Sequence, residues 1–276
     1  MSISGRYITI RGGNVIGTPP AIPLLLDLYP ATVAYSVRKL RNTYTGACIR
    51  VRRSIDNAEQ DIGFVGNDLD TASLLSFVGV NDGFVTTWYD QQGSNNLAQS
   101  TLNRQPIIIN SGSIINEGTK PSLNFARKGV NEDNLFVSTS SFSGNSSLFS
   151  VTSFYDTVNK CIFFSKRTNS NYILYPDTVN PSIPSSNSFL SNAFIDSVLT
   201  NVFTRGDART AMLGKRMLIS ILNYNMGAFT NYELGRDGSS IAALDHYQEL
   251  VIYSTDQSVN RTAIETNINN YYGIYP

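Results

Sequence analysis

Short stretches in which apolar and polar residues alternate fill the last two thirds of the chain. Such alternation places apolar side chains on one face of a β-strand and polar side chains on the other. Turn-forming Ser, Asn, Gly and Pro residues separate the stretches, and the Ser/Asn/Pro-rich segment 176–197 predicts a long surface loop. The predicted strands are 106–109, 121–125, 134–138, 147–154, 161–166, 171–175, 198–204, 216–223, 230–234 and 247–253. Many short strands at regular spacing are typical of an all-β sandwich or jelly roll.

The first third of the chain, residues 24–96, has a mixed pattern. Within 31–44, apolar residues recur at helical spacing, with Val33, Val37 and Leu40 on one face and basic residues off it. This spacing predicts an amphipathic helix over 31–44 whose basic side chains are solvated.

Three shorter elements are predicted after this helix. Alternation predicts strands at 48–54 and 84–89, the second followed by a polar turn-rich loop at 90–96. Between the strands, Asp70 is placed to cap the start of a short helix, and Gly79 is placed to end it.

The pattern also bears on the C-terminal stretch and on the single tryptophan. The stretch 258–272 has helical spacing and predicts a last helix that closes over the sandwich. Trp88, the only tryptophan, has two interpretations: a platform on which a sugar stacks, or a core residue. Its place in an apolar strand favours the core.

The N-terminal residues 1–23 differ from the rest. Residues 3–11 alternate weakly, and the glycines and prolines that follow read as a linker. We therefore expect an arm or edge strand and linker at 1–23, ahead of a single sandwich domain at 24–276. The arm has two interpretations, docking on a partner protein or adding a strand to its own sheet. It lacks the basic and apolar regions of a signal peptide, and no stretch reaches 18 apolar residues.

Charge and rare residues narrow the chemistry. Only 15% of the 276 residues are charged, with 21 basic and 21 acidic, which gives no electrostatic reason to expect a nucleic acid or membrane partner. Two distant cysteines and one histidine, His246, argue against a disulfide framework, a zinc site and most His-based triads. A calcium site at Asp237 and Asp245 is not supported, because the residues around them lack the ligand spacing that is usual for calcium. We expect no metal and no cofactor.

Several motifs in the first third resemble a known family. The matching residues are Asp27-Leu28-Tyr29, the segment 35–40, Val51-Arg52-Arg53 with Asp56, Asp61-Ile62 and Tyr89-Asp90-Gln91. They are similar to the catalytic domain of the fungal-type α-L-arabinofuranosidases of the B class, and the resemblance implies a concanavalin-like β-sandwich with a few short helices. Segments 234–238 and 247–253 resemble the last strands of laminin-G or concanavalin-like domains. The combination also resembles domains of tailed-bacteriophage fibre, spike or capsid-surface proteins.

The family's catalytic residues are matched only in part. Its general acid lies in a Gly-Gly-Asp turn, so the resemblance implies Asp237 as a general-acid candidate, and Arg236 with Asp237 as ligand-binding candidates. An ordinary turn is the other interpretation. The nucleophile's Asp-Leu-Glu-Asn-Gly segment is absent, and Cys161 stands alone where the family has adjacent cysteines. A retaining glycosidase needs two carboxyl groups about 5 Å apart, so one candidate does not suffice.

The other matching residues are predicted to support the fold rather than catalysis. Arginines that leave a half-buried strand need acceptors, so the aspartates of this set are expected to pair with its arginines. The predicted scaffold set is Arg52, Arg53, Asp56, Asp61, Tyr89, Asp90 and Gln91.

Together these observations predict a non-enzymatic bacteriophage structural protein, a fibre, spike or capsid-surface appendage located in the virion. Its lectin-like sandwich would take glycans as candidate ligands. The arm would contact other virion proteins, and the chain would form a homo-oligomer, with a trimer as one option. Two alternatives stay open: a retaining α-L-arabinofuranosidase-like hydrolase with Asp237 as acid, and a secreted glycan-binding module.

Overall fold

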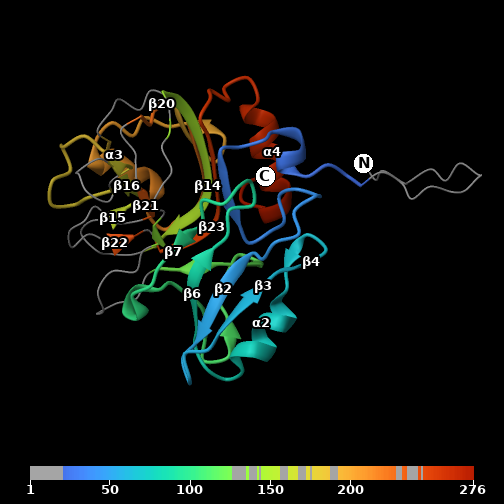
Figure 1. Cartoon of the computed structure of the whole chain (residues 1–276). Helices are drawn as coiled ribbons and strands as arrows, with labels where there is room; N and C mark the ends of the chain where they lie inside the picture. The colour runs from blue at the N-terminus through green and yellow to red at the C-terminus, as the bar shows by residue number, and fades with distance from the viewer. Residues whose placement is uncertain are drawn as a thin grey trace, which may run out of the picture.

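A computed structural model describes most of the chain (Figure 1). The described residues are 21–125, 135–136, 142, 144–155, 161–166, 172–174, 176–186, 192–227, 232–234, 242–243 and 245–276. Residues 1–20 of the predicted arm and linker, and the pair Arg236 and Asp237, lie outside them. In this part of the chain, no helix is both long enough and apolar enough to cross a membrane.

Strands dominate the described residues, and the helices are short. The helices are α1 (Leu25–Leu28), α2 (Thr71–Val78), α3 (Arg205–Met212) and α4 (Arg261–Tyr272), with a 3-10 turn at Leu102–Arg104. The strands are β1 (Val33–Ser36), β2 (Ile49–Arg53), β3 (Glu59–Ile62), β4 (Phe64–Val65), β5 (Asp68–Leu69), β6 (Gly83–Trp88), β7 (Leu97–Ala98), β8 (Ile107–Asn110), β9 (Ser113–Ile114), β10 (Asn116–Glu117), β11 (Lys120–Pro121), β12 (Leu123–Asn124), β13 (Leu135–Phe136), β14 (Asn145–Phe154), β15 (Cys161–Ile162), β16 (Phe164–Lys166), β17 (Tyr172–Ile173), β18 (Ala193–Ile195), β19 (Val198–Leu199), β20 (Lys215–Asn225), β21 (Tyr232–Leu234), β22 (Ala242–Ala243) and β23 (His246–Tyr253).

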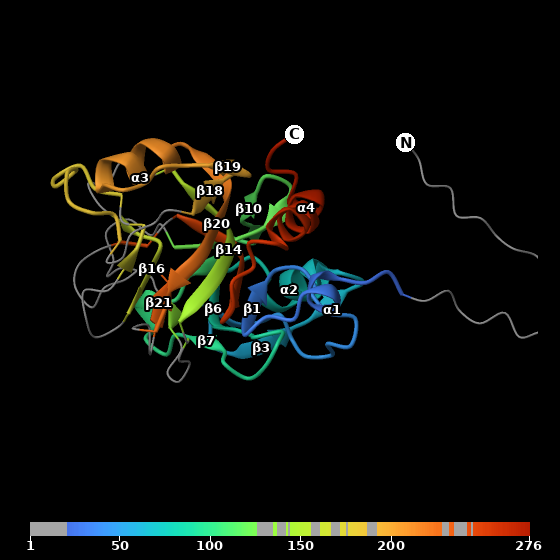
Figure 2. The ribbon, with the colours of Figure 1, turned by 90° about the horizontal axis from the view of Figure 1, so that it is seen from above.

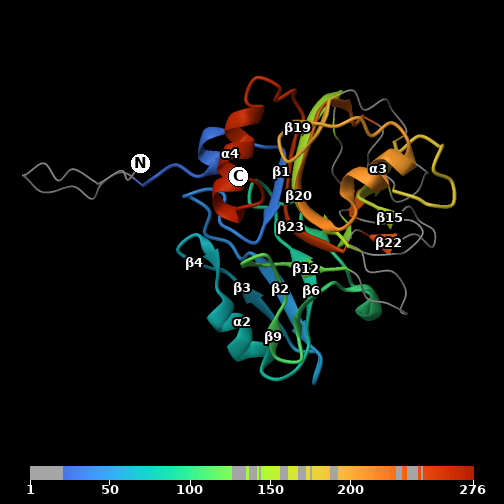
Figure 3. The same cartoon turned by 180° about the vertical axis from the view of Figure 1, so that it is seen from behind.

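Antiparallel pairing joins most of these strands into one curled sheet with two layers. In the first layer, β14 lies between β20 and β23, while β18 pairs with the far side of β20 and β1 with the far side of β23. In the second, β3, β2, β6 and β7 follow in order, and β13, β21, β16 and β17 continue it. Figures 1 and 2 show α4 and strands β16 and β21 on opposite sides of β14 and β20, and Figure 3 shows α4 and α3 on opposite sides of β20 and β23. The predicted all-β sandwich with a few short helices is confirmed.

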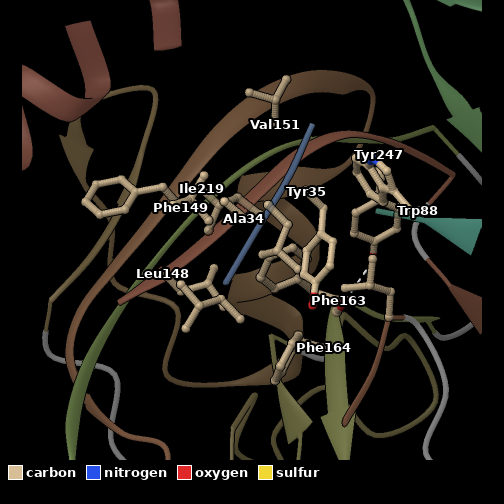
Figure 4. Close-up of a cluster of buried hydrophobic side chains, with 14 of the residues drawn as sticks. Ala34, Tyr35, Trp88, Leu148, Phe149, Val151, Phe163, Phe164, Ile219 and Tyr247 are labelled. Carbon is tan, nitrogen blue, oxygen red and sulfur yellow. Dashed lines mark hydrogen bonds between the residues drawn. The ribbon is translucent and has the colours of Figure 1, made fainter. Parts of the chain in front are cut away.

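The core lies between the two layers and is rich in aromatic side chains (Figure 4). Trp88 is fully buried, with its ring centroid 5.9 Å from that of Tyr35. Phe163 stacks on Tyr247 at 6.1 Å. Trp88 is therefore a core residue and offers no face to a sugar, as the strand pattern predicted.

The helix predicted over 31–44 is wrong. Residues 33–36 form β1 instead, pairing from Val33↔Ile252 to Ser36↔Glu249. All four β1 residues are buried, because the second layer covers one face of this strand and α4 covers the other, so no solvated face exists. The apolar spacing that suggested a helix has another cause. The strand and the irregular segment after it are buried on both sides, so apolar residues occur there without a helical face.

The region 198–212 also departs from its prediction. Only Val198–Leu199 of the predicted strand 198–204 forms a strand, and α3 follows, which alternation did not reveal. Thr204 caps α3, because its hydroxyl accepts from the amide of Asp207 and the Asp207 carboxylate accepts from the amide of Thr204. Segment 176–197, predicted as a loop, contributes strand β18 as well.

The two other predicted helices are confirmed. Asp70 accepts a hydrogen bond from the Ser73 amide at the start of α2, and Gly79 ends that helix with a φ of 64°. The last helix, α4, buries Ile264 and Ile268 against the outer face of the first layer. Because α4 covers this face, strand β14 is buried on both sides rather than alternating.

Candidate functional site

The arginines and aspartates of the family-like motif form ion pairs, but not all of the predicted ones. Arg53 Nη2 lies 2.7 Å from Asp56 Oδ2, as predicted. Asp61, however, pairs with Arg50, with 2.8 Å between Nε and Oδ1. The strand register places Arg50 directly opposite Asp61, and alternation turns Arg53 to the other face of the sheet. The predicted pairing of Asp61 with Arg52 or Arg53 is therefore wrong.

Arg52 is buried and takes neutral partners. Its guanidinium donates to Gln105 Oε1 and Asn57 Oδ1, each at 2.7 Å, and lies 4.6 Å from the Phe84 ring centroid. These contacts bind β2 to the segment before β8. Arg52 thus contacts amide oxygens, where the sequence predicted an aspartate as its partner.

Asp90 and Gln91 hold the irregular backbone that the sequence suggested was helical. Asp90 Oδ1 accepts from the amides of Ala34 and Gln92, at 2.9 and 3.0 Å. The Gln91 side chain accepts from the amide of Leu40 at 2.8 Å and donates to two carbonyls of residues 36–38. The predicted pairing of Asp90 with an arginine is wrong, because backbone amides satisfy this carboxylate instead.

Tyr89 extends the motif to the surface. Its hydroxyl donates to Asp61 Oδ1 at 2.7 Å, on the same oxygen that receives Arg50 Nε. A second bond joins Arg50 Nη2 to Asp61 Oδ2 at 3.0 Å. The side chains of Arg50 and Asp61 are 44% and 43% exposed. We call these three residues the Arg50–Asp61–Tyr89 face.

The candidate general acid Asp237 and its neighbour Arg236 lie outside the described residues, between β21 and β22. Strand β22 pairs in parallel with β15, with Cys161 opposite Ala242. The fold thus brings the strand of Cys161 beside the strand that follows Asp237, although the two are far apart in sequence. The catalytic and ligand-binding roles of Asp237 and Arg236 stay predictions.

Several buried carboxylates of the described residues are held in ion pairs. Glu249 binds Arg38 at 2.8 Å, Asp177 binds Arg205 at 3.0 Å, and Glu265 binds Arg261 at 2.6 Å. In each pair the carboxylate side chain is at most 1% exposed. A buried carboxylate in such a pair is held against its cation and turned away from solvent, which suits structure better than proton transfer.

A polar cluster around the only histidine was missed by sequence reasoning. Glu117 Oε1 accepts from the Tyr155 hydroxyl at 2.6 Å, and Glu117 Oε2 lies 3.7 Å from His246 Nε2. The other ring nitrogen of His246 lies 3.2 Å from the buried Ser122 hydroxyl. These residues lie up to 129 positions apart in the sequence, and their spacing forms no motif. Only the scarcity of histidine marked the site.

The cluster joins the β10–β11 hairpin to the first layer. Gln248 donates to the carbonyls of Glu117 and Lys120, each at 3.0 Å, and Arg216 donates to the same Glu117 carbonyl at 2.9 Å. Ser122 is fully buried, so its hydroxyl is not placed to attack a substrate. Among the described residues, no group of three His, Cys, Asp or Glu side chains is arranged to hold a metal ion.

The stability of the protein is expected to fall as the pH drops below about 6.5, through His246. Burial lowers the pKa of His246 below its ordinary value of 6.5, although Glu117 and Asp245 act to raise that pKa. Below pH 6.5 the unfolded chain therefore binds a proton at His246 more readily than the folded chain does. The stability that neutral His246 contributes is complete above pH 6.5 and is lost as the pH falls toward the lowered pKa. Urea unfolding at pH 7.5 and 5.5 measures how much the free energy of unfolding falls between the two pH values. The fall should be smaller for His246→Gln than for the unchanged protein. An equal loss in both would contradict this role.

Comparison with known proteins supports the fold. No protein-family model matches the sequence, and no curated protein matches it. Three solved structures of α-L-arabinofuranosidases are similar in fold. One is a GH54 enzyme soaked with a cyclic sulfate inhibitor, with a TM-score of 0.58 and 14% identity. Another is a glutamate-to-glutamine variant of a GH54 enzyme soaked with 4-nitrophenyl α-L-arabinofuranoside, with a TM-score of 0.62 and 14% identity.

The third similar structure is an arabinofuranosidase complexed with arabinofuranosyl-α-1,2-xylobiose, with a TM-score of 0.56 and 12% identity. In each comparison 88% of this chain is covered, but only 63% of the other chain. At these identities the likeness establishes a shared fold and leaves activity open. The chain has the α-L-arabinofuranosidase-like β-sandwich that its first-third motifs predicted.

Proposed function

We propose that this chain is a non-enzymatic glycan-binding β-sandwich that serves as a structural component of a bacteriophage particle. The non-enzymatic part of the proposal is supported by the contacts that the aspartates of the family-like motif make. Asp56 and Asp61 pair with arginines, and Asp90 accepts from backbone amides. The residues that carry the resemblance thus build the scaffold.

Chemistry supports the same proposal. Double displacement at a sugar needs a nucleophilic carboxylate and a carboxylic acid about 5 Å apart. The chain offers Asp237 as one candidate and lacks the segment that carries the family's nucleophile. The carboxylates of Glu249, Asp177 and Glu265 are buried in ion pairs with arginines, which is a structural role.

The virion role rests on the resemblance of the sequence to phage fibre, spike and capsid-surface domains. The weak strand pattern of residues 3–11 and the linker after it suit an arm that contacts other virion proteins. We propose a homo-oligomer on the particle surface, where a sandwich that binds neutral sugars would meet host or environmental glycans.

The purified protein is expected to release no 4-nitrophenol from 4-nitrophenyl α-L-arabinofuranoside over a long incubation, because a complete carboxylate pair is missing. The release is followed by absorbance, with an active arabinofuranosidase as the positive control. Turnover that disappears in Asp237→Asn would overturn the proposal and establish the hydrolase alternative.

Particle association is tested separately. If the chain is a virion component, it co-purifies with phage particles through a density gradient. A protein found wholly in the soluble fraction while still binding sugar would point to the glycan-binding module alone.

A further inference from the structure

We infer that the Arg50–Asp61–Tyr89 face, with Tyr44 at its border, is a shallow binding site for a neutral saccharide. The inference rests on the proposed glycan-binding function and assigns it a place. The face lies on the side of β2, β3 and β6 that α2 leaves open.

Strand register assembles this site. Arg50 of β2 stands between Asp61 of β3 and Thr87 of β6, and Tyr89 follows Thr87 on the same face. Arg53, on the opposite face, lies over the Phe77 ring of α2 at 5.0 Å. The helix therefore covers one side of this small sheet, and the other side presents Arg50 and Asp61 to solvent.

The hydrogen bonds within the face leave groups that suit sugar hydroxyls. Arg50 and Asp61 form a planar two-bond pair, and Tyr89 donates a third bond to Asp61 Oδ1. Within the described part of the chain, Arg50 Nη1 makes no hydrogen bond to protein and remains a donor. Asp61 Oδ2 accepts only from Arg50 and retains a lone pair. Adjacent hydroxyls of a sugar both donate and accept, so they match a donor beside an acceptor.

Two tyrosine rings supply the apolar surface that a sugar ring also needs. The Tyr44 hydroxyl donates to the Ala47 carbonyl at 2.8 Å, and its ring folds over Gly46, where an added Cβ would lie 2.7 Å from Cζ. The turn of Tyr44 leads into Cys48, whose carbonyl accepts from the Tyr89 amide. Tyr44 and Tyr89 thus border the same end of the strand pair, and part of each residue remains exposed.

Charge balance selects the class of ligand. Arg50 and Arg52 on β2 face Asp61 and Glu59 on β3, so the four formal charges cancel. Because the guanidinium of Arg50 is already neutralised, the face has no excess charge with which to attract an anionic sugar. A neutral saccharide fits better than a sialylated or sulfated one.

The test is a titration of the full chain with methyl glycosides, followed by amide chemical shifts in NMR. Methyl α-L-arabinofuranoside, methyl β-D-galactopyranoside and methyl α-D-glucopyranoside are the neutral probes, with N-acetylneuraminic acid as the anionic one. At least one neutral probe should bind and shift amides of residues 48–52, 59–62 and 87–89. The acid should bind more weakly.

Substitutions locate the site. Asp61→Asn and Tyr89→Ala are each expected to weaken binding about tenfold, the size of one lost charged hydrogen bond or its equivalent. Tyr89→Phe keeps the ring and should weaken it less. Asp56→Asn is the matched control, because Asp56 also forms an exposed ion pair with an arginine of β2, on the α2 side, and should leave binding unchanged.

The outcomes separate the site from the function. If a neutral sugar binds the unchanged protein and all four variants equally, the site assignment is wrong and glycan binding stands. If no neutral sugar binds the unchanged protein, both the site and the proposed glycan-binding function fail. Thermal unfolding of each variant confirms that a loss of binding is not a loss of fold.

Discussion

Replacing Arg38 with methionine is expected to lower the free energy of unfolding by about 3–5 kcal/mol, because it leaves Glu249 buried without its cation. Two bonds join the pair, Arg38 Nε to Glu249 Oε2 at 2.8 Å and Nη2 to Oε1 at 3.0 Å. The Glu249 side chain is 0% exposed. After the substitution its carboxylate retains only neutral hydrogen-bond donors such as the Ser36 hydroxyl. Desolvation then opposes folding.

Urea unfolding of Arg38→Met measures this loss, and Arg53→Met is the matched control. Arg53 also pairs with an aspartate, but that aspartate side chain is 46% exposed, so solvent screens the pair and its loss is expected to cost little stability. Methionine keeps most of the aliphatic volume in both variants, so the comparison isolates the charge. Equal losses in the two variants would show that burial of Glu249 carries no special cost.

Asp90→Ala is expected to cost about 2–4 kcal/mol of stability, because three backbone amides lose their acceptor at once. These amides belong to Ala34, Gln92 and Asn95, at 2.9, 3.0 and 3.3 Å. The loop after β6 would lose its hold on β1. Burial raises the pKa of Asp90, while the same amides act to lower it. The carboxylate is thus kept in place by backbone donors.

Asp90→Asn tests this explanation. Asparagine keeps one oxygen for two of the amides but points an N–H group at the third, so an intermediate loss is expected. Unfolding midpoints of the two variants and the unchanged protein, measured together, give the order. An Asn variant as unstable as the Ala variant would show that charge, rather than the count of acceptors, holds the loop.

Arg38 and Asp90 show that polar residues of the family-like motifs have a structural role in this fold. Arg38 and Asp90 both act on residues 33–40, where the chain is irregular after β1. Gln91 bonds to the same stretch through both ends of its amide. The polar residues after β6 therefore act as the internal connection between the first layer and the second.

The error over 31–44 shows the limit of periodicity. Val33, Val37 and Leu40 are all buried, as the helical pattern required. Burial by itself does not distinguish a helix face from a strand covered on both sides, because both remove the same side chains from water. The residues that decide between them, Ile252 on β23 and Gln91 after β6, lie far away in sequence.

Local signals were reliable where the physical cause was itself local. The Asp70 cap and the Gly79 helix end each depend on neighbours a few residues away. The helix α3 was missed although Thr204 and Asp207 form a capping pair, because alternation in the preceding residues predicted a strand. The carboxylate partners of Arg50 and Arg53 depended on register, which the sequence does not specify without the pairing.

By itself, the sequence determined the all-β sandwich, the family likeness of its first third, the last helix and the absence of the family's nucleophile segment. Spacing, turn residues and motif order carry this information, because each is written in consecutive positions. Only the tertiary structure decided that β1 is a strand, that Arg38 is buried on Glu249, and that Glu117, Tyr155 and His246 meet. It also decided that Arg50, Asp61 and Tyr89 share one open face. Such contacts arise when strands distant in the chain are set side by side, and pairing register rather than local propensity chooses them.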